Sequence, residues 1–197
     1  MNLVDRVKRI LLSPKTEWEV IDAEPATATE LYTRYIAPLA AIGPISQLIG
    51  YSVFGITVPF VGTYRVPIGS AITQAIVTYI LTLAGTYILA LIIDALAPTF
   101  NGQRNQIQAL KLAAYSLTAS WVAGIFALIP GLRILTLLGL YSLYLLYLGL
   151  PVLMKAPREK ALGYTAVVII AAIILSMVIG AIAGIFMRVP SAGMTIP

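Results

Sequence analysis

The sequence contains no cysteine and no histidine among its 197 residues. The lack of cysteine excludes disulfides, thiolate nucleophiles and cysteine-ligated metal sites. The lack of histidine removes the most common general base and the most common metal ligand. We also find no paired carboxylates inside the long apolar segments, no glycine-rich phosphate loop and no nucleic-acid-binding patch. These absences argue against an intramembrane enzyme, and we expect no catalytic residue, cofactor, metal or nucleic-acid partner.

Charged residues are scarce as well. They make up 11% of the chain, whereas a typical soluble domain is about a quarter charged. Hydrophobic residues make up 59%, and the mean hydropathy is +0.92. Because so little polar surface could not cover a soluble globule, the composition predicts an integral membrane protein.

The apolar residues gather in five long segments, each of which matches or exceeds the roughly 20 residues needed to cross about 30 Å of hydrocarbon. The predicted spans are residues 31–55, 67–96, 107–129, 132–154 and 163–187. Pro38, Gly43 and Pro44 interrupt the first span. The short link IPGLR makes the third and fourth spans antiparallel neighbours. The fold class is therefore an all-α, polytopic bundle of five transmembrane helices over residues 31–187, followed by a flexible external tail, 188–197.

Residues 1–30 form a separate interfacial segment on the cytoplasmic side. Apolar residues recur at helical spacing within residues 1–12, and the opposite side carries Arg6, Lys8 and Arg9. We interpret this as a helix lying on the membrane surface with its cations toward anionic lipid headgroups, while docking of a partner protein is the alternative. A second short helix follows, with Trp18 as an interfacial anchor. The spacing from Thr27 to Glu30 is that of a capping box opening the first span.

The basic residues set the predicted orientation. With the N-terminus inside, ten of the thirteen lysine and arginine residues lie on the inner side: Arg6, Lys8, Arg9, Lys15, Arg34, Arg104, Lys111, Lys155, Arg158 and Lys160. The outer side holds Arg65, Arg133 and Arg188. The positive-inside rule therefore predicts a cytoplasmic N-terminus and an external C-terminus.

Two opposite charges lie near the inner ends of consecutive spans. Asp94 lies about one turn before Pro98, at the inner end of the second span, and Lys111 lies about one turn into the third. A lone charge at membrane depth is costly, so we expect Asp94 and Lys111 to pair beneath a polar cap of Asn101, Gln103 and Arg104. Alternatively, Lys111 reaches the water by itself and Asp94 lies at the interface. An ion or proton site at Asp94 is less favoured, because no span holds a second carboxylate.

Three tyrosines, Tyr141, Tyr144 and Tyr147, share one side of the fourth span at intervals of three residues. Tyrosine hydroxyls at membrane depth need acceptors, which the third span could supply from Tyr115, Ser116, Thr118 and Ser120. We favour interhelical packing with such hydrogen bonds. The alternative is a polar groove for a lipid headgroup, lined by Tyr115, Tyr141, Tyr144 and Tyr147.

Small residues recur every four positions along the fifth span, at Ala172, Ser176, Gly180 and Gly184. Such a flat helix face lets two backbones approach closely. We favour packing inside the same bundle over a dimer interface.

Six stretches of the chain have the order and spacing of one known family: LLSPKTEWEVI, LIIDALAPTFNGQ, ALKLAAYS, WVAGIFALIPGLRIL, YSLYLLYLGLPVLMKAP and KALGYT. These stretches span nearly the whole chain, and through them the sequence resembles the bacterial branch of the Yip1 family. The resemblance implies five spans and a cytoplasmic N-terminus, in agreement with the charge distribution. Eukaryotic members associate with one another and with prenylated Rab-type GTPases. Their cytoplasmic Asp-Leu-Tyr-Gly-Pro motif has no counterpart here, so Rab binding is not carried over.

The leading functional hypothesis is a non-enzymatic, Yip1-like protein of the bacterial cytoplasmic (inner) membrane. It would organise the membrane or its protein partners, in a trafficking-type or membrane-shaping role, by self-association. Its expected partners are the lipid bilayer, anionic lipid headgroups, and copies of itself or other membrane proteins. The alternative is a lipid scramblase or small-solute transporter that uses a polar groove near Asp94 and Lys111.

Overall fold

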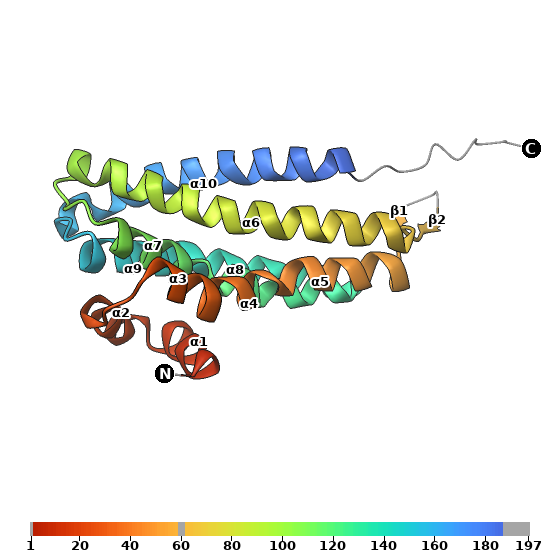
Figure 1. The fold of residues 1–197 in the computed structure, drawn as a ribbon, viewed down its shortest axis with the longest axis horizontal. Helices are drawn as coiled ribbons and strands as arrows, with labels where there is room; N and C mark the ends of the chain where they lie inside the picture. Colours follow the sequence, from red (N-terminus) through yellow and green to blue (C-terminus); the bar gives the residue numbers. More distant parts are fainter. Residues whose placement is uncertain (1, 59–61, 187–197) are drawn as a thin grey trace, which may run out of the picture.

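Five long apolar helical segments run the length of the molecule in the computed structural model (Figure 1). The structure describes residues 2–58 and 62–186, so the predicted tail, 188–197, lies outside the described residues. Within that part of the chain, the segments long and apolar enough to span a membrane are Ala28–Phe54, Ile68–Phe100, Gln106–Leu128, Pro130–Leu153 and Arg158–Gly184. The predicted five-span, all-α architecture is confirmed.

Two short helices precede the spans, α1 (Leu3–Leu12) and α2 (Pro14–Ala23). The Asn2 side chain caps α1 by accepting a hydrogen bond from the Val4 amide at 3.2 Å, and Pro14 occupies the first turn of α2, where its missing N–H costs nothing. Both helices lie against one flank of the bundle (Figure 1), where α2 contacts α9 and α1 contacts α8.

The first span opens with the predicted capping box. The Thr27 hydroxyl accepts from the Glu30 amide at 3.2 Å, and the Glu30 carboxylate accepts from the Thr27 amide at 3.1 Å. The span then alternates between regular and widened turns: α3 (Ala28–Leu31), η1 (Tyr32–Ile36), α4 (Ala37–Ala40), α5 (Ile42–Ile49) and η2 (Gly50–Phe54). The π-helical η1 comes just before Pro38, whose ring and missing N–H disfavour a regular α-helical ladder.

The link between the first two spans contains a small hairpin in an otherwise helical fold. Strands β1 (Ile56–Val58) and β2 (Gly62–Tyr64) pair antiparallel. The hairpin lies at the end of the bundle away from α2 (Figure 1). We call the opposite end, where α6 joins α7 and α9 joins α10, the linker end.

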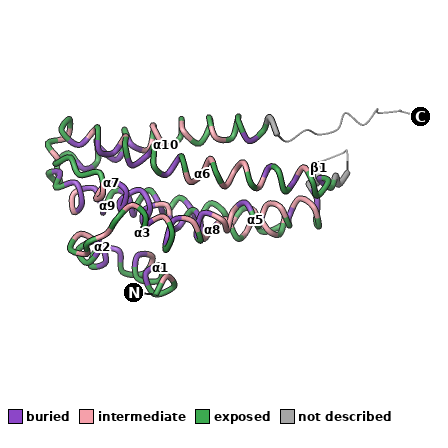
Figure 2. The backbone as a smooth tube through the Cα atoms, viewed as in Figure 1, coloured by how far each residue is buried: buried purple, intermediate pink, exposed green. Residues whose placement is uncertain are grey.

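The remaining spans are α6 (Ile68–Leu96) with η3 (Ala97–Phe100), then α7 (Gln106–Ser116), α8 (Thr118–Ala123) and η4 (Gly124–Leu128), then η5 (Pro130–Leu140) and α9 (Tyr141–Leu153), and last α10 (Arg158–Phe186). The third and fourth spans are contacting neighbours, as the short link between them predicts. Helix α7 lies in the centre, because α3, α6 and α9 all contact it and every residue from Ala109 to Ser116 is buried (Figure 2).

Trp18 fixes α2 to this core. Its side chain is 0% exposed, and its ring meets that of Tyr115 edge-on at 6.3 Å between centroids. A Cβ at Gly149 of α9 would lie 2.8 Å from the Trp18 ring and 2.5 Å from Leu112, so only glycine leaves room for the indole. The prediction of Trp18 as an interfacial anchor is therefore wrong, since its ring is part of the packed core.

Candidate functional site

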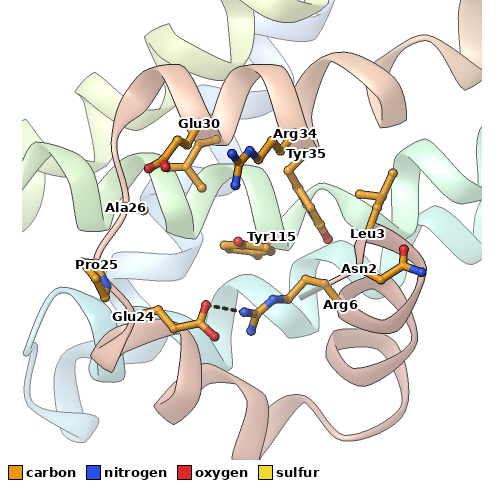
Figure 3. Close-up of a pocket in the computed structure, with 11 residues that line it drawn as sticks. Asn2, Leu3, Arg6, Glu24, Pro25, Ala26, Glu30, Arg34, Tyr35 and Tyr115 are labelled. Carbon is orange, nitrogen blue, oxygen red and sulfur yellow. Dashed lines mark hydrogen bonds and ion pairs between the residues drawn. The ribbon is translucent and has the colours of Figure 1, made fainter.

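A polar cavity of about 240 Å³ lies where α1, the α2–α3 link, the first turns of the first span (α3 and η1) and α7 meet (Figure 3). Its lining includes two cations, two carboxylates and two phenols: Arg6, Arg34, Glu24, Glu30, Tyr35 and Tyr115. Charged side chains are rare in this chain, so their convergence on one hollow makes it the strongest candidate site.

Arg6 crosses from α1 to α2 beneath this cavity. One terminal nitrogen donates to the Glu17 carboxylate at 2.5 Å, and the other donates to the Glu24 carboxylate. The guanidinium carbon lies 5.7 Å from the centroid of the Tyr115 ring, within cation–π range. Burial disfavours the charge, but the hydrogen bond to Glu24 and the charges of both glutamates outweigh it and raise the pKa of Arg6 above its usual value.

The predicted lipid-facing basic side of α1 therefore needs a correction. Lys8 and Arg9 are exposed, but Arg6 is only 6% exposed. The sequence could have predicted that Arg6 is buried. Arg6 lies three residues after Leu3 and four before Ile10, and this helical spacing places it on the apolar side of α1.

The acidic partners of Arg6 escaped the sequence analysis altogether. Glu17 and Glu24 are seven residues apart, so they share the side of α2 that carries buried Trp18 and Ile21. An acidic pair on an apolar helix side, opposite an arginine on another such side, is the pattern that could have revealed this contact.

The two tyrosines of the cavity come from different spans and touch each other. Their rings lie 4.5 Å apart between centroids, and the Tyr35 hydroxyl is 2.7 Å from that of Thr118. In Figure 3, the Tyr115 ring lies between the guanidinium groups of Arg6 and Arg34. Both tyrosines are buried, so their rings form part of the inner wall of the cavity.

Lys111 lies next to this cavity rather than beside Asp94. Its ammonium donates to the Ile21 carbonyl at 2.9 Å and to the Glu24 carbonyl at 2.5 Å, and the residue is 3% exposed. Asp94 instead accepts from Arg104 Nε at 3.3 Å. The predicted Asp94–Lys111 pair is therefore wrong. The C-terminal carbonyls of α2, which carry partial negative charge, take the ammonium because α2 packs against the bundle.

The other members of the predicted polar cap join the two loops at the linker end. Asn101 has a left-handed backbone (φ 57°), and its side-chain oxygen accepts from Lys160 at 3.0 Å. The backbone N–H of Gln103 donates to the backbone carbonyl of Met154 at 2.7 Å. Asn101 and Gln103 thus tie the α6–α7 link to the start of α10 and to the α9–α10 link, whereas Arg104 holds Asp94 of α6; the hydrogen bonds of Lys111 go to α2 instead.

The tyrosines of the fourth span do not form a groove with Tyr115. Tyr141, Tyr144 and Tyr147 are 36–41% exposed, because α9 turns Leu145, Leu146 and other leucines inward. The Tyr141 hydroxyl donates to the Leu11 carbonyl of α1 at 3.1 Å, not to the third span. The packing role favoured from the sequence is wrong because it paired these hydroxyls with the third span. The groove alternative is wrong because it placed these tyrosines beside Tyr115.

The small residues of α10 are mostly left open by their own bundle. Ala172 is half-buried, but Ser176, Gly180 and Gly184 are exposed. A Cβ built at Gly180 or Gly184 would meet no atom within 4 Å. The favoured interpretation, packing inside the same bundle, is wrong for these two glycines.

The chemistry available in the cavity is that of binding. Within residues 2–58 and 62–186, no group of three or more histidine, cysteine, aspartate or glutamate residues could hold a metal ion. Each carboxylate of the cavity already has a structural partner, Arg6 for Glu24 and the Thr27 cap for Glu30. Fixed charges of both signs beside buried phenols suit a polar, charged ligand group.

Comparison with known proteins places the chain among membrane proteins. A family model described as Yip1 domain matches residues 8–180, from within α1 into α10. The chain is 26% identical over 157 residues to the inner membrane protein YohC of Escherichia coli K12, covering 78% of this chain and 80% of that protein. The YohC protein of E. coli O6:H1, strain CFT073, matches equally well. No solved structure matches.

Proposed function

Since the chain belongs to the Yip1 family and is an integral protein of the bacterial inner membrane, we propose that it is a non-enzymatic organiser of that membrane. It acts by associating with copies of itself through α10 and by placing α1 and α2 at the cytoplasmic surface. Trafficking-type contacts or membrane shaping would follow from such assemblies.

The observation that carries this proposal is the exposed surface of the second half of α10. Within the first half, Tyr164 and Val168 are buried against the bundle. From Ile169 to Gly184, only Ala183 is buried. One exposed side of this half holds Ser176, Gly180 and Gly184, and a Cβ built at either glycine would meet no atom within 4 Å. Small residues on a lipid-exposed face suit close approach of a second helix, and a second copy brings the same face.

The distribution of basic residues supports a cytoplasmic position for the linker end. The α2, α6–α7 and α9–α10 segments come together there (Figure 1) and carry Lys15, Arg104, Lys155, Arg158 and Lys160. Arg65 and Arg133 lie in segments toward the hairpin end. The positive-inside rule then puts α1 and α2 at the cytoplasmic lipid boundary.

The alternative function, a scramblase or transporter with a groove near Asp94 and Lys111, gains no support from their positions. Asp94 pairs at the linker end with Arg104, and Lys111 is closed off by the carbonyls of α2. Protein reconstituted in liposomes is therefore expected not to accelerate lipid flipping. Flipping that Asp94→Asn abolishes would reverse this ranking.

Self-association can be tested with single thiols, because the chain has no native cysteine. We expect Gly180→Cys to form a crosslinked dimer in native membranes after treatment with a short bis-maleimide. Val178→Cys is the matched control, since it is exposed on the opposite side of α10. Equal crosslinking at both positions, or none at Gly180→Cys, would contradict the interface.

A second variant tests the same surface without a crosslinker. Gly180→Ile with Gly184→Ile adds bulk where a Cβ meets nothing in the monomer, so the fold is expected to persist. Subunit counting by single-molecule photobleaching in nanodiscs should shift from dimers to monomers. An unchanged count in a folded variant would remove α10 from the interface.

A further inference from the structure

We infer that the cavity between α1, α3 and α7 binds a zwitterionic headgroup that joins a phosphate to a primary ammonium, as phosphoethanolamine does. This inference goes beyond the proposed function and does not depend on self-association. It rests on the position of the cavity, the balance of its charges and its size.

The cavity lies where a lipid headgroup would lie. The Thr27 capping box marks the start of the first span, and Arg34 lies two turns further along. On the flank, α1 exposes apolar Val4 and Leu12, as expected of a helix at the headgroup boundary. A pocket between such a helix and the first turns of a span opens at headgroup depth.

One cation of the cavity is available for a phosphate. Arg6 already holds two carboxylates, whereas the ion pairs found among the described residues do not include Arg34. Arg34 is exposed, and in Figure 3 its guanidinium points toward the Tyr115 ring. A guanidinium fork matches the geometry of phosphate oxygens, so Arg34 is the anion-binding group.

The carboxylates decide which anion fits. Glu24 and Glu30 both line the cavity, and a purely anionic headgroup such as phosphatidylglycerol would meet their repulsion. An ammonium on the same ligand turns this repulsion into attraction. Glu24 engages Arg6 through only one of its carboxylate oxygens, and its side chain is 44% exposed, so the second oxygen can accept from the ammonium.

The size of the cavity selects a headgroup rather than a whole lipid. Its volume of about 240 Å³ is below the roughly 300–1,000 Å³ of pockets that enclose a drug-sized ligand. Its apolar lining includes Leu31, which is 4% exposed, and half-buried Leu3, so the cavity offers no room for acyl chains. The lipid chains would then remain in the membrane while the headgroup fills the cavity.

The test is native mass spectrometry of the full-length protein, with phosphatidylethanolamine and phosphatidylglycerol of matched chains added separately. We expect retention of phosphatidylethanolamine at about tenfold lower lipid concentration, the difference made by one charge-assisted contact. Equal retention of the two lipids would overturn the proposal.

Soluble glycerophosphoethanolamine serves as the second probe. Displacement of bound lipid shows that the headgroup alone is recognised, and failure to displace at any concentration contradicts headgroup recognition.

Three variants locate the site. Arg34→Gln should reduce phosphatidylethanolamine retention about tenfold, and Arg34→Lys should restore part of it. Arg9→Gln is the matched control, because Arg9 is exposed on α1 and does not line the cavity. Limited proteolysis of Arg34→Gln beside the wild-type protein shows whether the variant is folded, and Gly180→Cys crosslinking in the same background reports association separately, so failure of this proposal is distinguishable from failure of self-association. Unchanged retention in folded Arg34→Gln would exclude the cavity.

Discussion

The third and the fifth spans are built differently. In the most apolar stretch of the third span, 67% of the residues are buried inside the protein, against 11% in the fifth. Around α7, apolar side chains, ion pairs and a buried lysine form a core like that of a soluble domain. The second half of α10 contacts α6 along one side, through residues such as Leu175 and Ile179, and leaves the rest of its surface bare. In lipid, exposed apolar residues carry no hydrophobic penalty, so α10 can remain bare, whereas the charges near α7 require partners on α1 and α2.

Removing the Arg6 charge is the largest expected disruption of the packed region. Arg6→Ala leaves Glu17 buried without its partner, and breaking a buried ion pair from one side costs about 3–5 kcal/mol. We expect a loss of free energy of unfolding near the lower limit, because Glu24 is partly exposed. Limited proteolysis should cut first between α1 and α3.

The matched control for this change is Arg9→Ala on the exposed side of the same helix, which should leave both stability and cleavage unchanged. If Arg6→Ala and Arg9→Ala behaved alike, the core-like character of this region would be disproved.

A glycine substitution sharpens the comparison through the fit of Trp18. Gly149→Ala places a Cβ 2.8 Å from the Trp18 ring, and overpacking of this kind costs about 1–3 kcal/mol. In a Trp121→Phe background, Trp18 emission should shift to longer wavelength as the indole leaves the core. Gly69→Ala, which meets nothing within 4 Å, should stabilise α6 slightly. A Trp18 spectrum unaltered by Gly149→Ala would mean that α2 does not dock there.

The spans were predictable because their length and apolarity follow from the membrane alone. The capping box of Thr27 and Glu30 was predictable because all its contacts lie within four residues. Arg6, Trp18 and Lys111 were misplaced for one shared reason: the prediction put residues 1–30 on the lipid surface, whereas α2 packs against α7 and α9. That docking depends on Gly149, more than a hundred residues away in sequence, and periodicity within one helix carries no information about it.

The corrected pairing of Lys111 makes a quantitative prediction. Lys111→Met should cost about 1–3 kcal/mol, because the Ile21 and Glu24 carbonyls lose their buried donor. Asp94→Asn weakens only the partly exposed contact with Arg104, worth about 0–1 kcal/mol. Because Asp94 and Lys111 share no partner, the double variant should be additive within about 0.5 kcal/mol. A double-mutant cycle of SDS-induced unfolding measures this, and a larger coupling would reinstate the pair expected from sequence.

The smallest change in the free energy of unfolding is expected in the second half of α10, where most side chains are exposed. Ile174 of α10 is 57% exposed, so Ile174→Ala removes contacts with lipid rather than with protein. The free energy of unfolding in nanodiscs should change by less than about 0.5 kcal/mol. Ile93→Ala is the matched control, since Ile93 is 0% exposed and its truncation should cost about 2–5 kcal/mol. The contrary outcome is a large loss of unfolding free energy for Ile174→Ala in the dimer that is absent in the Gly180→Ile, Gly184→Ile monomer. It would show that the partner copy covers this side of α10 as well. Lipid alone cannot explain it, because contacts with lipid do not depend on association.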